Sequence, residues 1–130
     1  MDGNNCFLDT NIVVEFLRGN IQVINYLEEN RNFVISAIVL GELEFGVQNA
    51  KQYVKHTKQL KDFMIGVQVI NLDEKTAIFY GQIKTELRKI GKPIPDNDIW
   101  IAALTMQYNA ILLTNDAHFK DIEALESKQI

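Results

Sequence analysis

The chain has 130 residues, of which 47% are hydrophobic, and its formal net charge is −4. This length and apolar content suit a single domain with a full core, so we expect one domain over residues 1–130 and no extended disorder. The acidic balance argues against a protein that binds nucleic acid by general electrostatic attraction, although a nuclease whose acidic site binds cations remains possible.

The first half of the chain alternates short apolar runs with helical patterns. We predict strands over residues 6–8 and 33–35. We predict helices over residues 12–17, 21–29, around 41–47 and about 50–64. Ser36 follows the second strand and is a suitable N-cap for the helix after it.

The second half continues the alternation. The pattern predicts a strand over residues 68–70, a helix that Asp73 caps and that ends at Gly91, and a helix over 99–108 that is apolar on nearly every side. A strand over 110–113 follows, then a short helix around 119–121 with room for an edge strand in the tail. Short apolar strands between helices predict an α/β sandwich around a central, mainly parallel sheet of four to five short strands.

Four carboxylates lie where these elements begin or end. Asp9 directly follows the first strand and Asp116 follows the fourth, and the carboxyl ends of parallel strands meet at one edge of a sheet. Glu42 lies on a partly apolar helix face, and Asp98 lies in the first turn of the apolar helix. Each has a purely structural alternative as an N-cap, a turn residue, a surface side chain or a favourable helix start.

Taken together, the four acids predict a metal site. Carboxylates gathered at one edge repel each other unless a hard cation lies among them. Three or four of them can hold one divalent ion, or two ions that activate a water against a phosphodiester. His56 and His118 are isolated in the sequence, so we do not expect zinc. A non-catalytic receiver-like module is the alternative, but it needs a lysine after the last central strand, where this chain has Asn115 and Asp116.

Four segments resemble a known family. LDTN at 8–11, LGELEFGV at 40–47, NDIWIAA at 97–103 and LTND at 113–116 are similar to the motifs of PIN domains. The resemblance is closest to the VapC toxins, the ribonucleases of type II VapBC toxin–antitoxin systems. It extends from Asp9 to about Leu125, with the motifs in family order. The resemblance therefore implies a PIN-like α/β/α sandwich.

Carried over residue by residue, the resemblance assigns the acidic site. It implies that Asp9, Glu42, Asp98 and Asp116 are both catalytic and metal-binding. It also implies that neighbouring polar residues orient these acids through hydrogen bonds. These supporting residues are Thr10, Asn11, Asp96 and Asn115.

The resemblance also implies an activity. It suggests a Mg²⁺- or Mn²⁺-dependent endoribonuclease that cleaves single-stranded or loop RNA with a metal-activated water. It suggests a homodimer, inhibited by a cognate VapB-type antitoxin whose C-terminal segment occupies a groove and approaches the acids. Hetero-tetramers or larger assemblies with the antitoxin fit the same scheme, and DNA is contacted only through the antitoxin. A PIN-fold nuclease for DNA or structured nucleic acid is the alternative.

Two sets of residues outside the acidic site are candidates for contacts with partners. Lys84 and Arg88 share a helix face and Lys92 follows nearby, so they are candidate RNA contacts, with an ordinary solvated helix face as the alternative. Apolar residues on the helices near the groove are candidate antitoxin anchors. They are Phe16, Leu17, Phe45 and Val47.

The chain has no feature of a secreted or membrane protein. Residues 1–5 carry no basic side chain, and the apolar runs are too short for a signal peptide or a membrane span. The single cysteine, Cys6, has no partner for an intrachain disulfide. We therefore expect a cytoplasmic protein without a membrane partner.

Overall fold

The central element is a sheet of five parallel strands in the order β3–β2–β1–β4–β5. The computed structural model describes residues 6–130; residues 1–5, on which part of the signal-peptide expectation depends, lie outside this range. The strands are β1 (Cys6–Leu8), β2 (Phe33–Ser36), β3 (Val69–Ile70), β4 (Ile111–Leu113) and β5 (Ser127–Lys128). The predicted α/β class is confirmed, and the sheet is parallel throughout.

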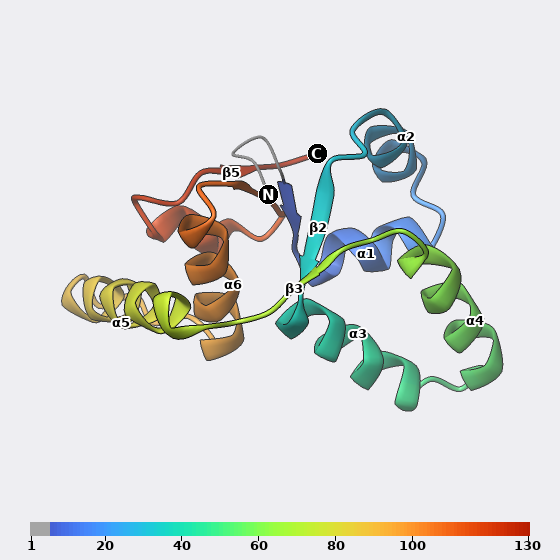
Figure 1. The fold of residues 1–130 in the computed structure, drawn as a ribbon, viewed down its shortest axis with the longest axis horizontal. Helices are drawn as coiled ribbons and strands as arrows, with labels where there is room; N and C mark the ends of the chain where they lie inside the picture. The colour runs from blue at the N-terminus through green and yellow to red at the C-terminus, as the bar shows by residue number, and fades with distance from the viewer. Residues whose placement is uncertain (1–5) are drawn as a thin grey trace.

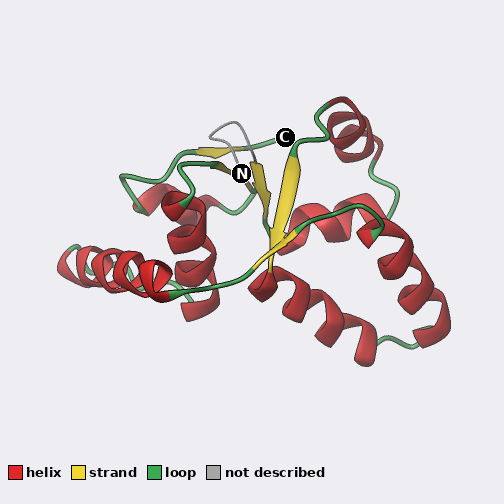
Figure 2. Cartoon of the chain, viewed as in Figure 1, coloured by secondary structure: helices red, strands yellow, loops and turns green. Residues whose placement is uncertain are grey.

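Helices cover both faces of this sheet. Figure 1 shows α5 and α6 on one side and α1, α2 and α4 on the other, with α3 extending from the carboxyl end of β2. The same layers appear by element type in Figure 2. The α-helices are α1 (Thr10–Leu17), α2 (Ile21–Glu29), α3 (Ala37–Gln48), α4 (Tyr53–Met64), α5 (Glu74–Lys89) and α6 (Asp96–Gln107). A 3₁₀ helix, η1 (Ala117–Asp121), lies between β4 and β5.

The core lies between the sheet and these helices. The strand residues Leu8, Ile35 and Leu112 are fully buried. In α6 every residue from Ile101 to Thr105 is buried, as its nearly uniform apolar sequence predicts. No helix in the described part of the chain combines the length and apolar character that a membrane span requires.

Caps explain where the helices begin. Asp9 accepts a hydrogen bond from the Thr10 amide, so α1 begins immediately after β1 rather than at residue 12. Pro95 has φ −56° at the start of α6, so this helix begins at Asp96 rather than at residue 99. Ser36 caps α3 by accepting from the Val39 amide at 3.0 Å, and Asp73 forms a capping box with Thr76 at the start of α5. The predicted Ser36 and Asp73 caps are confirmed.

Strand register brings distant parts of the chain together at the carboxyl edge of the sheet. Leu8 of β1 pairs with Leu113 of β4, and the Asp9 amide donates to the Leu113 carbonyl at 3.0 Å. The residues that follow β1 and β4 therefore lie side by side, next to the start of α3 after β2. This edge carries the candidate site.

Candidate active site

Asp9 is the most buried of the predicted acids, with 5% of its surface exposed. Its Oδ1 accepts from the Thr10 amide at 2.8 Å, and its Oδ2 accepts from the Thr114 hydroxyl at 2.7 Å. Burial raises the pKa of Asp9, the hydrogen bonds from Thr114 and Thr10 oppose this, and the charges of Glu42 and Asp116 add to it. Asp9 is thus both a helix cap and a fixed carboxylate among other acids.

Thr114 is a site residue that the sequence reasoning missed. Its hydroxyl donates to Asp9 and accepts from the Asp116 amide at 3.0 Å. It is 2% exposed, so this hydroxyl connects the end of β1 to the loop after β4 inside the protein. The available signal was a threonine between a buried strand and an Asn-Asp turn.

Glu42 and Glu44 lie on different faces of α3. Glu42 is half-buried and its Oε1 accepts from the Thr10 hydroxyl at 2.7 Å. Glu44 is exposed. The position of each residue around the helix therefore brings only Glu42 to the carboxyl edge of the sheet. Thr10, which was predicted to orient an acid, contacts one.

Asp98 is a partly buried acid whose pKa is raised by burial and by the other acids. Its side chain is 17% exposed, at the start of α6. Burial raises the pKa of Asp98 from 3.8 to about 6, and the charges of Asp9 and Glu42 contribute to the rise, while His118 opposes it. Together with the influence of Glu42 and Asp116 on Asp9, this places all four predicted acids in one electrostatic cluster.

His118 lies within this cluster, so the expectation that it is isolated was wrong. Its Nε2 is 2.7 Å from Asp98 Oδ2, and its Nδ1 is 3.1 Å from Asp116 Oδ1. The backbone amide of His118 also donates to Asp116 Oδ1 at 3.3 Å, which turns the loop back toward α6. The signal available in the sequence was that His118 lies two residues after Asp116.

The other predicted supporting residues face elsewhere. The Asp96 carboxylate accepts from the Tyr80 hydroxyl at 2.8 Å and pairs with Lys84 at 3.0 Å, so it contacts α5. Asn115 Oδ1 accepts from the Ile130 amide at 3.1 Å and ties down the C-terminal tail. Asn11 is exposed on α1. The structure therefore gives none of these three a contact with the four acids.

The candidate RNA-binding cations are exposed, and two of them have acidic partners. Lys84 pairs with Asp96, and Lys92 lies 3.5 Å from Asp121. Arg88 is exposed on α5. Surface pairs of this kind are weak and exchange readily, so they do not prevent contact with a phosphate.

The donor set fits a divalent cation. Carboxylate oxygens are the ligands that Mg²⁺ and Mn²⁺ prefer, and the mutual repulsion recorded at Asp98 is the kind that a bound cation relieves. Asp98, Asp116 and His118 each offer one ligand atom, and these atoms lie within 4.8 Å of one another. The Nε2 atom of His118 is buried and has no aligned hydrogen-bond partner among the described residues.

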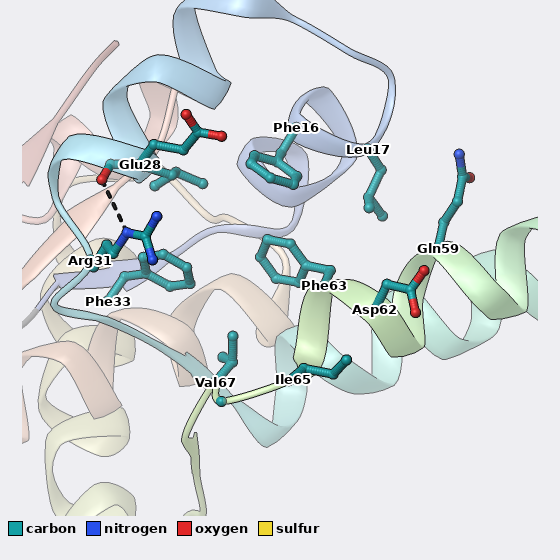
Figure 3. A pocket seen from close by; sticks show the side chains of 12 residues that line it. Phe16, Leu17, Glu28, Arg31, Phe33, Gln59, Asp62, Phe63, Ile65 and Val67 are labelled. Carbon is teal, nitrogen blue, oxygen red and sulfur yellow. Dashed lines mark hydrogen bonds between the residues drawn. The ribbon is translucent and has the colours of Figure 1, made fainter.

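Two neighbouring cavities, which we together call the apolar path, lead toward Glu42. The larger, about 650 Å³, has Phe16, Phe33 and Phe63 at its base and Glu28, Arg31 and Asp62 around it (Figure 3). The smaller, about 270 Å³, is lined by Thr10, Glu42 and Val47, among others. Leu17 and Gln59 line both cavities, and Glu42 is the one of the four acids that lines the smaller one.

Comparison with known proteins gives consistent results. Residues 6–125 match the PIN domain family. The chain is 34% identical over 123 residues to a protein of Rickettsia felis named ribonuclease VapC2, covering 91% of this chain and 92% of that protein. A ribonuclease VapC2 of Haemophilus influenzae is 31% identical over 124 residues, covering 93% and 94% of the two chains. The fold also superposes on a chain in the crystal structure of VapBC2 from Rickettsia felis bound to a promoter DNA fragment. The TM-score is 0.91 at 33% sequence identity, and the superposition covers 97% of this chain and 98% of that one.

Proposed function

Because the chain belongs to the PIN domain family, we propose that it is a divalent-metal-dependent endoribonuclease and the toxin of a VapBC-type pair. One observation carries the proposal: Asp9, Glu42, Asp98 and Asp116 come from four separate segments and form one electrostatic cluster at the carboxyl edge of the sheet. The family match over residues 6–125 also supports the expectation that the chain forms one domain.

The residues of the cluster have separable roles in this proposal. Asp9, Glu42, Asp98 and Asp116 would hold a divalent cation, Mg²⁺ or Mn²⁺. Thr114 and Thr10 hold Asp9 and Glu42 in place through the hydrogen bonds at 2.7 Å. A bound cation would supply an acidified water and neutralise charge on the phosphodiester. The protein contributes a set of acids, two of them fixed by hydrogen bonds, so little rearrangement of Asp9 and Glu42 is needed when the cation and substrate bind.

RNA is the proposed substrate, because the matched relatives of Rickettsia felis and Haemophilus influenzae are named ribonucleases. Lys84, Arg88 and Lys92 are proposed to contact its phosphates from α5 and the loop after it. A DNA nuclease with the same fold is the alternative. The acidic cluster does not distinguish these two because both substrates present a phosphodiester to the metal.

Metal removal tests the proposal directly. We expect the purified protein to cleave a looped RNA with Mg²⁺ or Mn²⁺, to lose all cleavage in excess EDTA, and to recover it when the cation is restored. Gel analysis of the RNA, beside single-stranded DNA of the same sequence, measures how cleavage depends on the cation and on the kind of nucleic acid. Equal cleavage in EDTA would contradict the metal site, and preferred cleavage of the DNA would favour the alternative substrate.

The antitoxin is proposed to occupy the apolar path. Phe63 lies at the base of the larger cavity, with ring centroids 5.1 Å from Phe16 and 6.0 Å from Phe33. An amphipathic segment placed on these rings could continue past Leu17 toward Glu42, because the two cavities share lining residues. Of the predicted anchors, Phe16, Leu17 and Val47 line this path, whereas Phe45 is 71% exposed outside it.

A Phe63→Ala variant should bind the antitoxin at least about 30-fold more weakly, since a buried aromatic anchor typically contributes 2 kcal/mol or more. Calorimetry with the proposed antitoxin would measure the loss. Ile78→Ala is the control: Ile78 is 61% exposed on α5 and lines neither cavity, so affinity should stay within about threefold. Unchanged affinity in the Phe63→Ala variant would place the antitoxin elsewhere.

A homodimer is also proposed, with hetero-tetramers or larger assemblies when antitoxin binds. The support from this chain is a set of exposed apolar side chains on α3 and α4: Phe45, Tyr53 and Val54 are 71%, 46% and 80% exposed. Apolar side chains at such exposure are common at interfaces between subunits. Sedimentation equilibrium of the purified protein measures the assembly state.

A further inference from the structure

The position of His118 is not explained by an all-carboxylate metal site. Its ring lies between two of the acids, with Nε2 2.7 Å from Asp98 Oδ2 and Nδ1 3.1 Å from Asp116 Oδ1. A histidine that only filled space beside Phe119 would not need to direct both nitrogens at carboxylates. The arrangement therefore calls for a role in the chemistry of the cluster.

The two ring nitrogens are in different surroundings. Nε2 is buried and lies 2.7 Å from Asp98 Oδ2, and a hydrogen bond from His118, although poorly aligned, lowers the pKa of Asp98. Nδ1 faces Asp116, whose Oδ1 also accepts from the backbone amide of His118. When a cation enters, Asp116 can hold the N–H on Nδ1, and the lone pair of Nε2 is then free to face the ion. In metal sites, a carboxylate that accepts from one imidazole nitrogen commonly orients the other nitrogen onto the ion.

The spacing of the donor atoms is suitable for one ion. One ligand atom from each of Asp98, Asp116 and His118 lies within 4.8 Å of the other two. Ligands that share a cation lie at most about twice a metal–ligand bond apart, or roughly 4–5 Å. For a cation to enter between them the ring has to move away from Asp98; His118 lies on the short 3₁₀ helix η1, and its side chain is 29% exposed.

We propose that His118 Nε2 is a nitrogen ligand of the divalent cation, oriented by Asp116, and that it makes the site favour Mn²⁺ over Mg²⁺. This inference rests on the proposed function, since it concerns the same cation. Both ions prefer oxygen ligands, but Mg²⁺ is bound almost entirely by oxygen, whereas Mn²⁺, as a first-row transition metal, accepts an imidazole nitrogen more readily than Mg²⁺ does. Replacing one oxygen ligand by imidazole therefore shifts the preference of an otherwise acidic site toward Mn²⁺.

Pulsed electron paramagnetic resonance of the protein with bound Mn²⁺ tests the ligand itself. Labelling the protein with ¹⁵N-histidine should produce a ¹⁵N coupling to the manganese in the unmodified protein. The coupling should vanish in His118→Ala and persist in His56→Ala, since His56 is exposed on α4 and in none of these contacts. A manganese signal from bound metal without nitrogen coupling would overturn the inference. Failure of the unmodified protein to bind Mn²⁺ at all would instead contradict the proposed metal site.

Calorimetric titration tests the selectivity. His118→Ala should weaken Mn²⁺ binding at least about tenfold and Mg²⁺ binding by less than about threefold. His118→Gln, which offers an oxygen at a similar reach, should keep Mg²⁺ affinity and still lose affinity for Mn²⁺. Thermal unfolding without metal establishes that both variants fold. If His118 only occupies the empty site as a competing cation, His118→Ala would bind both ions more tightly, and this outcome would also overturn the inference.

Discussion

An Asp98→Asn variant is expected to lose more than about 100-fold in RNA cleavage while its metal-free form becomes more stable than the unmodified protein. The loss follows from removing a charged metal ligand. Mutating even a residue that only orients a ligand typically lowers metal affinity or activity by about 10- to 100-fold. The gain follows from the pKa of Asp98, which rises from 3.8 to about 6 because the carboxylate is buried and repelled by Asp9. At neutral pH that rise lowers the free energy of unfolding of the metal-free protein by about 3 kcal/mol.

The raised pKa of Asp98 makes the stability of the metal-free protein depend on pH. A carboxyl whose pKa is raised by folding binds its proton more tightly in the folded state, so metal-free stability falls as pH rises from about 4 to about 6. Urea unfolding in EDTA at pH 4.5 and pH 7.5 should show this fall in the unmodified protein and a smaller one in Asp98→Asn.

Asp96→Asn is the matched control for Asp98→Asn, because Asp96 lies two residues earlier and its carboxylate faces Tyr80 and Lys84. It should retain cleavage within about threefold, as expected for an exposed pair. Full cleavage by Asp98→Asn would contradict the assigned role of Asp98. Equal loss in the Asp96→Asn control would mean that the whole first turn of α6 matters, and not this carboxylate.

Thr114→Val is expected to destabilise the protein by about 2 kcal/mol at neutral pH and to reduce cleavage about 10- to 100-fold. The substitution keeps the shape of the side chain and removes the hydroxyl that donates to Asp9 and accepts from the Asp116 amide. Without that donor the buried Asp9 carboxylate loses the strongest influence that lowers its pKa. The pKa of Asp9 therefore rises further, and the carboxylate form needed for metal binding becomes less populated.

The destabilisation by Thr114→Val should shrink as the pH falls. The lost hydrogen bond stabilises the charged form of Asp9, so its absence matters less once Asp9 is protonated in both proteins. Thr114→Ser keeps the hydroxyl and should recover most of the cleavage, measured at a temperature where all variants are folded. If Thr114→Ser were as impaired as Thr114→Val, the methyl group and its packing would be responsible instead of the hydrogen bond.

The strands and most helices could be predicted from local sequence, because caps and apolar runs act over a few residues. Ser36 and Asp73 were identified as caps for this reason, and the structure confirms both. The starts of α1 and α6 were placed too late because Asp9 and Pro95 are the residues directly before these helices. Helical periodicity alone does not show where the first turn of a helix begins.

The candidate site was predictable to the extent that its residues follow strands. Asp9 and Asp116 could be placed at one edge because all strands run in parallel, whereas choosing Glu42 over Glu44 depended on the family resemblance. Thr114 also follows a strand, but neither its role nor that of His118 follows from this position alone. Their contacts cross between segments, and the direction of a loop side chain such as His118 depends on how η1 packs against the start of α6.

The hydrogen bond between Thr114 and Asp9 joins residues 105 positions apart. During synthesis β1 leaves the ribosome first, but β4, which pairs with it and carries Thr114 and Asp116, is made near the end of the chain. The acidic cluster therefore cannot assemble on a nascent chain that has not yet released β4. A ribosome-bound fragment that ends before β4 would carry three of the four acids and no complete site, so the proposed cleavage activity would require β4 to have been made and paired with β1.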